Sequence, residues 1–368
     1  MNVKIHSIIA ILFCIYEKEK QGIKKTWEIR YHPLRGEWVI IAAHRQSRPW
    51  QGLFSGKKVE KPPPYSKDCP FCPGNKRVSG VENPDYKSVF AFDNDHPCVG
   101  EKSPIPQESP GFPYTVKRAF GKSRVLCYDP RHDLSLCRLP LERVIRVIEA
   151  WQDERKILSK IKDIEHVYIF ENRGKEVGVS NPHPHCQIYA LPFVFETFKK
   201  ESELSESYYK EKKRTILQDM LHIELEQGKR IIEKENGIVS FIPWCARWAY
   251  ETWIVPLEPY KAVEELDTNL TKSLARILKN TLIRMDNLWR MEMPYILALH
   301  DAPKNRNLGF HFHIEIYPLF RKPGLLKYLA GPETGGGSFL ADTSPEEKAE
   351  ELKNINTKHY MEEDNESC

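Results

Sequence analysis

The sequence has no apolar run long enough to span a membrane. A transmembrane helix needs about 20 apolar residues, whereas the candidate stretch runs only from Ser7 to Tyr16 and is followed by lysine-rich sequence. The stretch also lacks the small-residue cleavage site of a signal peptide. We therefore expect no membrane partner. We interpret residues 1–25 as an extension that is disordered or does not belong to the mature protein.

A strong excess of charge of one sign is also missing. The chain of 368 residues carries 55 lysines and arginines against 51 aspartates and glutamates, a formal net charge of +4. Proteins that coat nucleic acid concentrate positive charge far more strongly. With 40% hydrophobic and 29% charged residues, the composition is that of a globular chain with room for two domains. We expect no nucleic-acid partner.

The nine cysteines do not form a disulfide framework. Their number is odd and their spacing is irregular, unlike the even, regularly placed cysteines of small secreted proteins. This pattern predicts a reducing compartment, the cytoplasm, in which thiols remain free to bind metal.

A P-loop for nucleotide phosphates is absent as well. The stretch from Gly331 to Ser338 is rich in glycine, but no Gly-Lys-Ser/Thr follows it and no strand directly precedes it. A nucleotide site, if there is one, must therefore use other residues.

The sequence does contain a pair of histidines at the start of an expected strand, within Ser180-Asn181-Pro182-His183-Pro184-His185-Cys186-Gln187-Ile188-Tyr189. In an extended chain, residues two apart point to the same face. Pro184 stiffens the connection between the two rings. The pattern indicates that one imidazole binds a metal ion while the other attacks phosphorus, although such a pair can also be a simple surface feature.

A Cys-x-x-Cys knuckle, Cys69-Pro70-Phe71-Cys72, follows a proline-rich loop. Both thiolates can reach one tetrahedral ion, with two further ligands from elsewhere in the chain. A redox pair is the rival interpretation. We favour zinc, because the proline after the first cysteine and the loop setting do not resemble the helix start of a redox motif.

The histidine stretch is repeated in the second half of the chain. His183 and His185 reappear as His311 and His313, and Ile188-Tyr189 as Ile316-Tyr317, all 128 residues later. Two copies of a strand, helix, strand, loop and His-x-His strand unit therefore lie in tandem. The first copy has Gln187 where the second has Glu315, and His300 joins the second pair as a third imidazole suited to a transition metal. We interpret the first copy as catalytic and the second as structural.

Other elements follow from local pattern. Residues 27–42 predict a β-hairpin, residues 141–161 an amphipathic helix, residues 196–237 a charged helical region and residues 345–352 a charged helix. Arg45 and Arg48 follow the hairpin and suit phosphate binding, or are simply solvated. Asn94 and Asp95 end a short strand and can bind a base or a ribose, or form an ordinary turn.

These motifs resemble those of the galactose-1-phosphate uridylyltransferases, a branch of the histidine-triad superfamily. The resemblance covers about residues 27–348. It rests on Phe170-Glu171-Asn172, on Gly178, and on the stretch from Ser180 to Gln187. It includes the Arg-Pro-Trp-Gln-Gly after the hairpin, the Cys-x-x-Cys, the Asn-Asp pair and the second His-x-His.

The resemblance implies an α+β fold of two tandem histidine-triad-like repeats, with a largely antiparallel sheet flanked by helices. Residues 26–192 would form the first half, with the zinc site and the nucleophile. Residues 193–345 would form the second half, with a second metal site, and residues 346–368 a charged tail.

The resemblance also implies roles for individual residues. His185 would be the nucleophile, assisted by Gln187. Zinc would be held by Cys69, Cys72, His132 and His183. A second metal ion, iron or zinc, would be held by His300, His311, His313 and a carboxylate, for which Glu201 fits best and Glu196 and Glu203 are rivals. Asn94 and Asp95 would contact the uridine. The phosphates would be contacted by Arg45, Arg48, Asn172, Ser180 and Gln187. The hexose would be contacted by Lys327, Tyr328 and Glu333, offered by the partner subunit of a homodimer.

The implied reaction belongs to galactose metabolism. The uridylyl group of UDP-glucose would pass to His185 and then to galactose 1-phosphate, giving glucose 1-phosphate and UDP-galactose by a ping-pong route. An adenylyl-transferring relative that acts on ADP-glucose is one alternative, and an inactive zinc-stabilised nucleotide-binding module is another. Cys186, Val179 and Phe339 depart from the usual family pattern, and Phe339 puts the sugar contacts in doubt more than the chemistry.

Overall fold

The computed structural model describes residues 26–47, 62–179 and 181–362. The expected extension 1–25 and the site residues Arg48 and Ser180 lie outside the described residues. No helix in these described ranges is both long and apolar enough to cross a bilayer.

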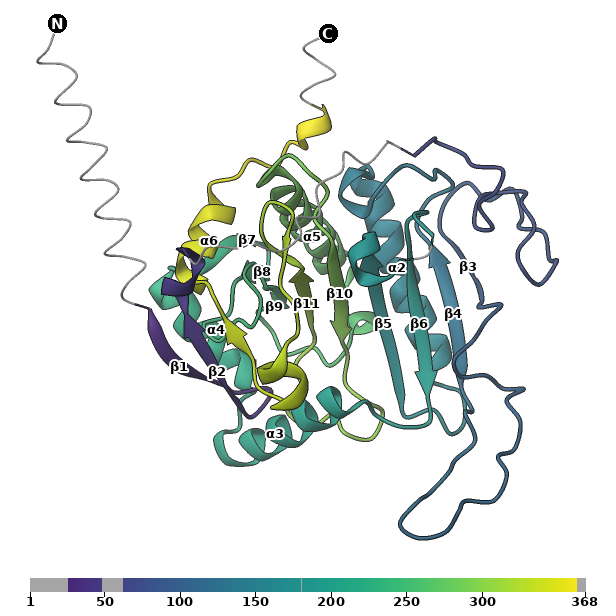
Figure 1. Cartoon of the computed structure of the whole chain (residues 1–368), viewed down its shortest axis with the longest axis horizontal. Helices are drawn as coiled ribbons and strands as arrows, with labels where there is room; N and C mark the ends of the chain where they lie inside the picture. Colours follow the sequence, from purple (N-terminus) through teal and green to yellow (C-terminus); the bar gives the residue numbers. More distant parts are fainter. Residues whose placement is uncertain (1–25, 48–61, 180, 363–368) are drawn as a thin grey trace, which may run out of the picture.

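One antiparallel sheet of nine strands forms the centre of the protein (Figure 1), in the order β3-β4-β6-β5-β10-β11-β9-β8-β7. Every neighbouring pair in this order is antiparallel. The predicted α+β fold with a largely antiparallel sheet is confirmed. The strands are β3 (Phe90–Asp93), β4 (Lys122–Cys127), β5 (His166–Arg173), β6 (His185–Leu191), β7 (Ile231–Glu235), β8 (Ile238–Phe241), β9 (Thr252–Pro256), β10 (Tyr295–His300) and β11 (His313–Pro318).

The sequence repeat appears in the sheet as an internal symmetry. The units β4-α2-β5-β6 and β9-α5-β10-β11 follow the same order along the chain, and they meet where β5 pairs with β10. At that seam Phe170 lies opposite Ala298, and these two residues are themselves 128 positions apart. A local twofold axis therefore passes between them. Because its direction is perpendicular to the sheet, equivalent residues of the two halves lie on the same face.

Two helices, α2 (Leu141–Leu158) and α5 (Thr268–Asn287), cover one face of this sheet. In α2 the buried positions Val144, Val147, Ile148 and Trp151 recur at helical spacing and form an apolar stripe. Strand β6 alternates, with Cys186, Ile188 and Ala190 buried in the same core. The other side chains of β6 are therefore directed to the opposite face.

A second sheet joins the two ends of the chain. The predicted hairpin is confirmed as β1 (Trp27–His32) and β2 (Glu37–Ala42), and β14 (Leu340–Ala341) pairs with β2 in parallel. The hairpin thus packs with a strand from the predicted second half. A two-stranded sheet, β12 (Phe320–Lys322) with β13 (Leu325–Leu326), lies between these elements in sequence. The predicted boundaries between the halves remain a prediction.

The charged region 196–237 is not helical throughout. It forms α3 (Glu196–Lys212) and α4 (Ile216–Gln227), and then β7. Gly228 ends α4 with φ of +64°, a left-handed conformation that glycine adopts at little cost. The prediction of helix up to residue 237 is therefore wrong from this glycine onward.

The predicted charged tail is part of the folded protein as far as it is described. Helix α6 (Pro345–Lys353) confirms the helix expected at residues 345–352 and buries Ala349 and Leu352 in the main core. Glu346 pairs with Arg30 and Arg230. Beyond the helix, His359 is buried and contacts Asp286 at 3.2 Å. The charged side chains of α6 thus include Glu346, which pairs with two buried arginines, as well as residues that face solvent.

Asp286 near the end of α5 connects four segments of the chain. Its two carboxylate oxygens accept hydrogen bonds from both terminal nitrogens of Arg173 at 2.8 Å. The Cys137 thiol, the His359 ring and the Met293 amide also bond to the carboxylate. Burial raises the pKa of Asp286, but Arg173 and the hydrogen bonds outweigh that effect and lower it to about 2.

We predict that Asp286→Ala lowers the free energy of unfolding by about 3–5 kcal/mol, because it leaves the buried Arg173 without its partner. The folded-state pKa lies below the unfolded value of 3.8, so the wild-type contribution is complete above about pH 4 and is lost as the pH falls toward 2. Equilibrium urea unfolding at a series of pH values measures both effects. Asp85→Ala removes an exposed carboxylate that is paired only with an exposed lysine and should change little. Equal effects of the two substitutions would contradict the assignment.

Candidate functional site

The first histidine pair lies on the face of the sheet opposite α2 and α5. His185, Gln187 and Tyr189 are only partly buried, whereas the residues between them are buried. Gln187 lies opposite Phe170 of β5, so the same face of β5 carries Asn172 two residues further on. This face brings three of the predicted site residues together: His185, Gln187 and Asn172.

His185 is held in one tautomer by the backbone. Its Nδ1 lies 2.7 Å from the carbonyl oxygen of His183. Since a carbonyl only accepts, Nδ1 carries the proton and Nε2 carries the free electron pair. Burial lowers the pKa of His185, and the carbonyl contact offsets this only in part. Among the described residues none hydrogen-bonds Nε2. The ring is therefore a neutral imidazole with an available nucleophilic nitrogen.

Gln187 is likewise oriented by a neighbour. The hydroxyl of Tyr189 donates to its amide oxygen at 3.0 Å. That contact leaves the amide nitrogen free to donate to an oxygen near His185. A phosphoryl oxygen is a suitable acceptor for such a donor.

The predicted zinc ligands converge on one buried point. Cys69, Cys72, His132 and His183 each offer one ligand atom, and these atoms all lie within 4.8 Å of one another. The Cys72 sulfur lies 3.8 Å from Nδ1 of His132 and 3.6 Å from Nδ1 of His183. A tetrahedral zinc ion with ordinary bond lengths separates sulfur and nitrogen ligands by about 3.6 Å. The spacing fits zinc.

Protonation in this group also fits a metal. Nε2 of His183 lies 2.9 Å from the carbonyl oxygen of Asp129, so Nε2 is the donor and Nδ1 presents its electron pair to the group. Burial lowers the pKa of His183 to about 4 and raises the pKa of Cys72 to about 11. The Cys72 thiol thus stays protonated without a cation, and metal binding must release its proton.

The candidate metal group and the His185 ring are directly connected. His183, one of the four candidate ligands, supplies the carbonyl that fixes the tautomer of His185. The ring of Phe71, from within the Cys-x-x-Cys knuckle, packs against the His185 ring at a centroid distance of 5.0 Å. Metal in this group would therefore hold the strand end that carries His185, with all four positions taken by protein atoms.

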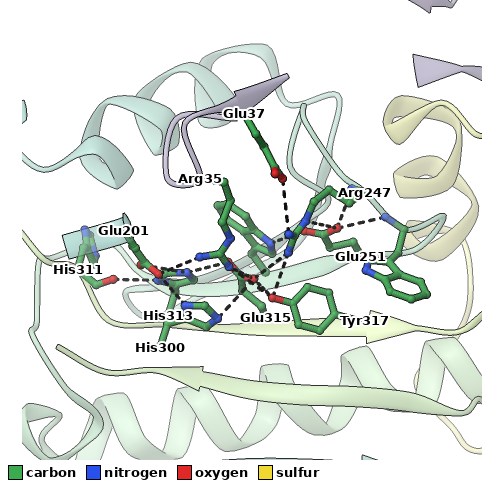
Figure 2. Close-up of polar contacts among 12 residues, drawn as sticks. Arg35, Glu37, Glu201, Arg247, Glu251, His300, His311, His313, Glu315 and Tyr317 are labelled. Atoms are coloured by element: carbon green, nitrogen blue, oxygen red, sulfur yellow. Dashed lines mark hydrogen bonds and ion pairs between the residues drawn. The ribbon is translucent and has the colours of Figure 1, made fainter. Parts of the chain in front are cut away.

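His313 of the second histidine pair lies in a buried polar cluster with His300 and with Glu201 of α3 (Figure 2). Glu201, His300 and His313 come within mutual ligand distance. Glu201 Oε2 contacts His300 Nδ1 at 2.8 Å, and Glu315 Oε1 contacts His313 Nε2 at 3.1 Å. Of the three acidic candidates, Glu201 is the buried one that enters the cluster, whereas Glu203 pairs with Arg306 at the surface. The structure favours Glu201 over both rivals.

His311 does not join this cluster. Its Nδ1 lies 3.0 Å from the Thr215 hydroxyl and its Nε2 lies 2.9 Å from the carbonyl of Pro256. Both ring nitrogens thus have other partners, so the geometry does not support His311 as a ligand. Glu315 instead lies in the cluster next to both His300 and His313.

A guanidinium group also enters the second cluster. Arg35, from the turn between β1 and β2, places Nη1 3.1 Å from Glu201 and Nη2 2.6 Å from Glu315 (Figure 2). Burial by itself raises the pKa of Glu315, but Arg35, His300 and His313 together hold it well below its usual value. Both carboxylates of the cluster are therefore charged and already have an internal cation.

The remaining predicted substrate residues separate into two places. Asn94 and Asp95 follow β3, at the edge of the half-sheet that carries His185. Arg45, Lys327, Tyr328 and Glu333 instead line one cavity of about 390 Å³ beside β12, β13 and β14. Lys327 pairs with Glu333 at 3.1 Å, and Arg45 pairs with Asp342 at 3.2 Å. No residue that lines this cavity comes from β6 or from the zinc group.

The fold and the site together define a protein of two histidine-triad-like repeats, in which one half places a partly buried imidazole beside a possible metal-binding group. Two models of one protein family match most of the chain. One described as "Galactose-1-phosphate uridyl transferase, N-terminal domain" matches residues 17–194, and the corresponding C-terminal domain matches residues 201–364. The chain belongs to the galactose-1-phosphate uridyl transferase family.

Individual relatives are similar over nearly their full length. Galactose-1-phosphate uridylyltransferase of Haemophilus influenzae is 34% identical over 90% of this chain and 95% of its own. That of Thermotoga maritima is 33% identical over 89% and 98%. A solved uridylyltransferase structure is 32% identical with a TM-score of 0.73, over 89% of this chain and 97% of the other. An ADP-glucose phosphorylase of Arabidopsis thaliana shares the fold at 20% identity and a TM-score of 0.72, over 89% and 98%.

The sequence repeat already indicates that Glu315 lies beside His313, although the predicted ligand set does not include it. The 128-residue shift makes His313 the counterpart of His185 and Glu315 the counterpart of Gln187, so Glu315 faces the same side of its strand as His313. By the same shift His300 corresponds to Asn172. Arg35 has no such signal, because the hairpin that carries it lies outside the repeat.

We predict that Cys72→Ser removes about one equivalent of bound zinc per chain and lowers the melting temperature, because a hydroxyl does not replace a thiolate on zinc. Metal analysis of the purified protein, with thermal unfolding of the same samples, measures this. Cys98→Ser is the control, since Cys98 is exposed and outside the group. Unchanged zinc in the Cys72 variant would rule out this group as the binding site.

Proposed function

We infer that this chain is a nucleotidyltransferase that moves the uridylyl group of UDP-glucose to galactose 1-phosphate. Family membership over both halves supports this inference, and the observation that carries the chemistry is the neutral His185 ring with its proton held on Nδ1. Transfer of the uridylyl group through a covalent intermediate requires a nucleophile with a free electron pair. His185 has one, and the amide of Gln187 lies on the same face of the strand as a donor.

In the first step, Nε2 of His185 attacks the α-phosphorus of UDP-glucose. A nitrogen–phosphorus bond forms, the bond from phosphorus to the glucose 1-phosphate oxygen breaks, and glucose 1-phosphate leaves. In the second step, a phosphate oxygen of galactose 1-phosphate attacks the same phosphorus and releases His185. The carbonyl of His183 keeps the proton on Nδ1 throughout, and it stabilises the positive charge that the ring carries while it is bonded to phosphorus.

Charge on the phosphoryl oxygens needs preorganised donors. We assign this role to the Gln187 amide, whose oxygen is already engaged by Tyr189. Asn172 lies on the same face, and Asn94 with Asp95 lies toward the edge of this half-sheet, where the uridine would bind. Donors fixed in advance lower the barrier because they need no reorganisation during the reaction.

We propose that the group Cys69, Cys72, His132 and His183 holds zinc in a structural role. These four residues would tie the Cys-x-x-Cys loop to the strand end that carries His185 when zinc is bound, and would leave no position on the ion for substrate. Cys69 and Cys72 must remain reduced to serve as ligands, which supports a reducing compartment, the cytoplasm, as the place of action.

We also propose that each active site is completed by a second copy of the chain. Lys327, Tyr328 and Glu333, expected to bind the hexose, line the same cavity as Arg45, which is expected to bind phosphate. No residue that lines this cavity comes from β6. A twofold dimer supplies the missing half reciprocally, so that two composite sites form per dimer.

We predict that His185→Asn lowers kcat on the order of 10⁴–10⁶-fold while UDP-glucose still binds, because only the nucleophile is removed. With UDP-glucose labelled on the α-phosphorus and no acceptor, the wild type should gain acid-labile, base-stable label that galactose 1-phosphate releases. The matched control is the second-half counterpart, His313→Asn, which should still become labelled.

Three outcomes would contradict the proposal. Label retained in the His185 variant and lost in the His313 variant would move the nucleophile to the other half. Label from ADP-glucose alone would identify an adenylyl transfer enzyme. No label from either nucleotide sugar would favour a binding module without turnover.

We predict that two inactive variants restore activity when they are mixed. A dimer of one His185→Asn chain and one Lys327→Ala chain contains one site with both wild-type residues and one site with neither. Random exchange makes half of the dimers mixed, so the mixture should reach about a quarter of wild-type turnover. Steady-state rates after refolding the two variants together measure this. Mixing His185→Asn with His185→Gln is the control and should restore nothing; restoration no better than that control would place both residues in one subunit's site.

A further inference from the structure

The second cluster contains a positive group at the place where a metal ion would bind. Arg35 lies between Glu201 and Glu315 and gives one terminal nitrogen to each carboxylate, at 3.1 and 2.6 Å. Its side chain is 5% exposed. We propose that the Arg35 guanidinium replaces a second metal ion in this chain. The protein then binds one metal ion, at the group of Cys69, Cys72, His132 and His183, and the carboxylates of the second cluster are neutralised by an internal cation.

Charge compensation is the first argument. Glu201 and Glu315 are both buried, and buried carboxylates require a partner of opposite charge. The planar fork of an arginine matches this need, because its two terminal nitrogens can bind two carboxylates at once. A divalent cation in the same cluster would lie next to the guanidinium, and the two positive groups would repel each other strongly because the cluster is buried.

The carboxylate oxygens are the second argument. Glu201 Oε2 already accepts from Arg35 and contacts His300 Nδ1 at 2.8 Å. Glu315 Oε2 accepts from Arg35 and from the Tyr317 hydroxyl, and Glu315 Oε1 contacts His313. Three of the four carboxylate oxygens that could be metal ligands thus already have hydrogen-bond partners, and the fourth, Glu201 Oε1, lies 3.8 Å from His313 Nε2.

The backbone of the turn is the third argument, because it directs the Arg35 side chain into the cluster. Leu34 is 2% exposed and packs with Leu217 and Trp253 in an apolar cluster beneath α4. The amide of Gly36 donates to the carbonyl of His32 at 2.8 Å. Gly36 has φ of +64°, and a Cβ there would come within 3.0 Å of the Lys200 side chain on α3. The turn is thus fixed on both sides of Arg35.

The consequence is a difference between the two halves. In the first half Nε2 of His185 has no hydrogen-bond partner among the described residues. In the second half the equivalent His313 contacts Glu315, and Arg35 fixes that carboxylate. The second site would serve as an internal ion-pair cluster that attaches the β1–β2 hairpin and α3 to the sheet.

The test is the metal content of the purified full-length chain. We expect about one equivalent of zinc in the wild type, and about two equivalents of metal in Arg35→Gln after incubation with zinc or cobalt(II). The additional cobalt should lack the thiolate charge-transfer absorption that marks the cysteine group. Arg247→Gln is the matched control, because Arg247 lies 3.9 Å from the same Glu315 oxygen without lying between the two carboxylates. It should keep one equivalent.

A second measurement decides the matter if Arg35→Gln does not fold. In the wild-type background, Glu201→Gln should leave the metal content unchanged, and Arg35→Lys should remain at one equivalent. Two equivalents in the wild type, with one lost in Glu201→Gln, would overturn the proposal. One equivalent in a folded Arg35→Gln would overturn it as well. These readouts do not depend on turnover, so they separate this proposal from the proposed function.

Discussion

The antiparallel pairing of β5 with β10 is the interaction on which the rest of the structure depends. It joins two copies of the same strand–helix unit edge to edge, so nine strands share one sheet and two helices share one core. The local twofold at Phe170 and Ala298 keeps equivalent residues on one face. A cross-strand row therefore runs from Gln187 through Phe170 and Ala298 to Glu315.

The two halves differ in what covers that face. Over β6, the histidine and glutamine are only partly buried, and the cysteine-containing group lies at the end of the strand. Over β11, α3 and the β1–β2 turn cover the face and bring in Glu201 and Arg35. The exchange of glutamine for glutamate matches this difference, since a neutral amide suits a site open to a charged substrate, whereas a carboxylate needs buried cations around it.

Much of the site could be predicted because it is local in sequence. His183, His185 and Gln187 are within five residues, and strand alternation places the latter two on one face without knowledge of the fold. Cys69 and Cys72 are similarly close, and the structure brings His132 and His183 to them. The second cluster was harder to predict, because its residues are far apart in the sequence. His311 was predicted as a ligand from the family resemblance, yet its ring contacts Thr215 and Pro256, which only the folded chain brings near.

The sequence by itself determined the repeat, the strand alternation, the Cys-x-x-Cys knuckle and the two His-x-His pairs, since these follow from spacing along one strand or one knuckle. Only the tertiary structure decided two things: the place of Glu315 in the second cluster, and the entry of Arg35 between two carboxylates. The physical reason is that burial of charge is settled by partners far apart in the chain. Arg35 and Glu315 are separated by 280 residues, and no local pattern records that they meet.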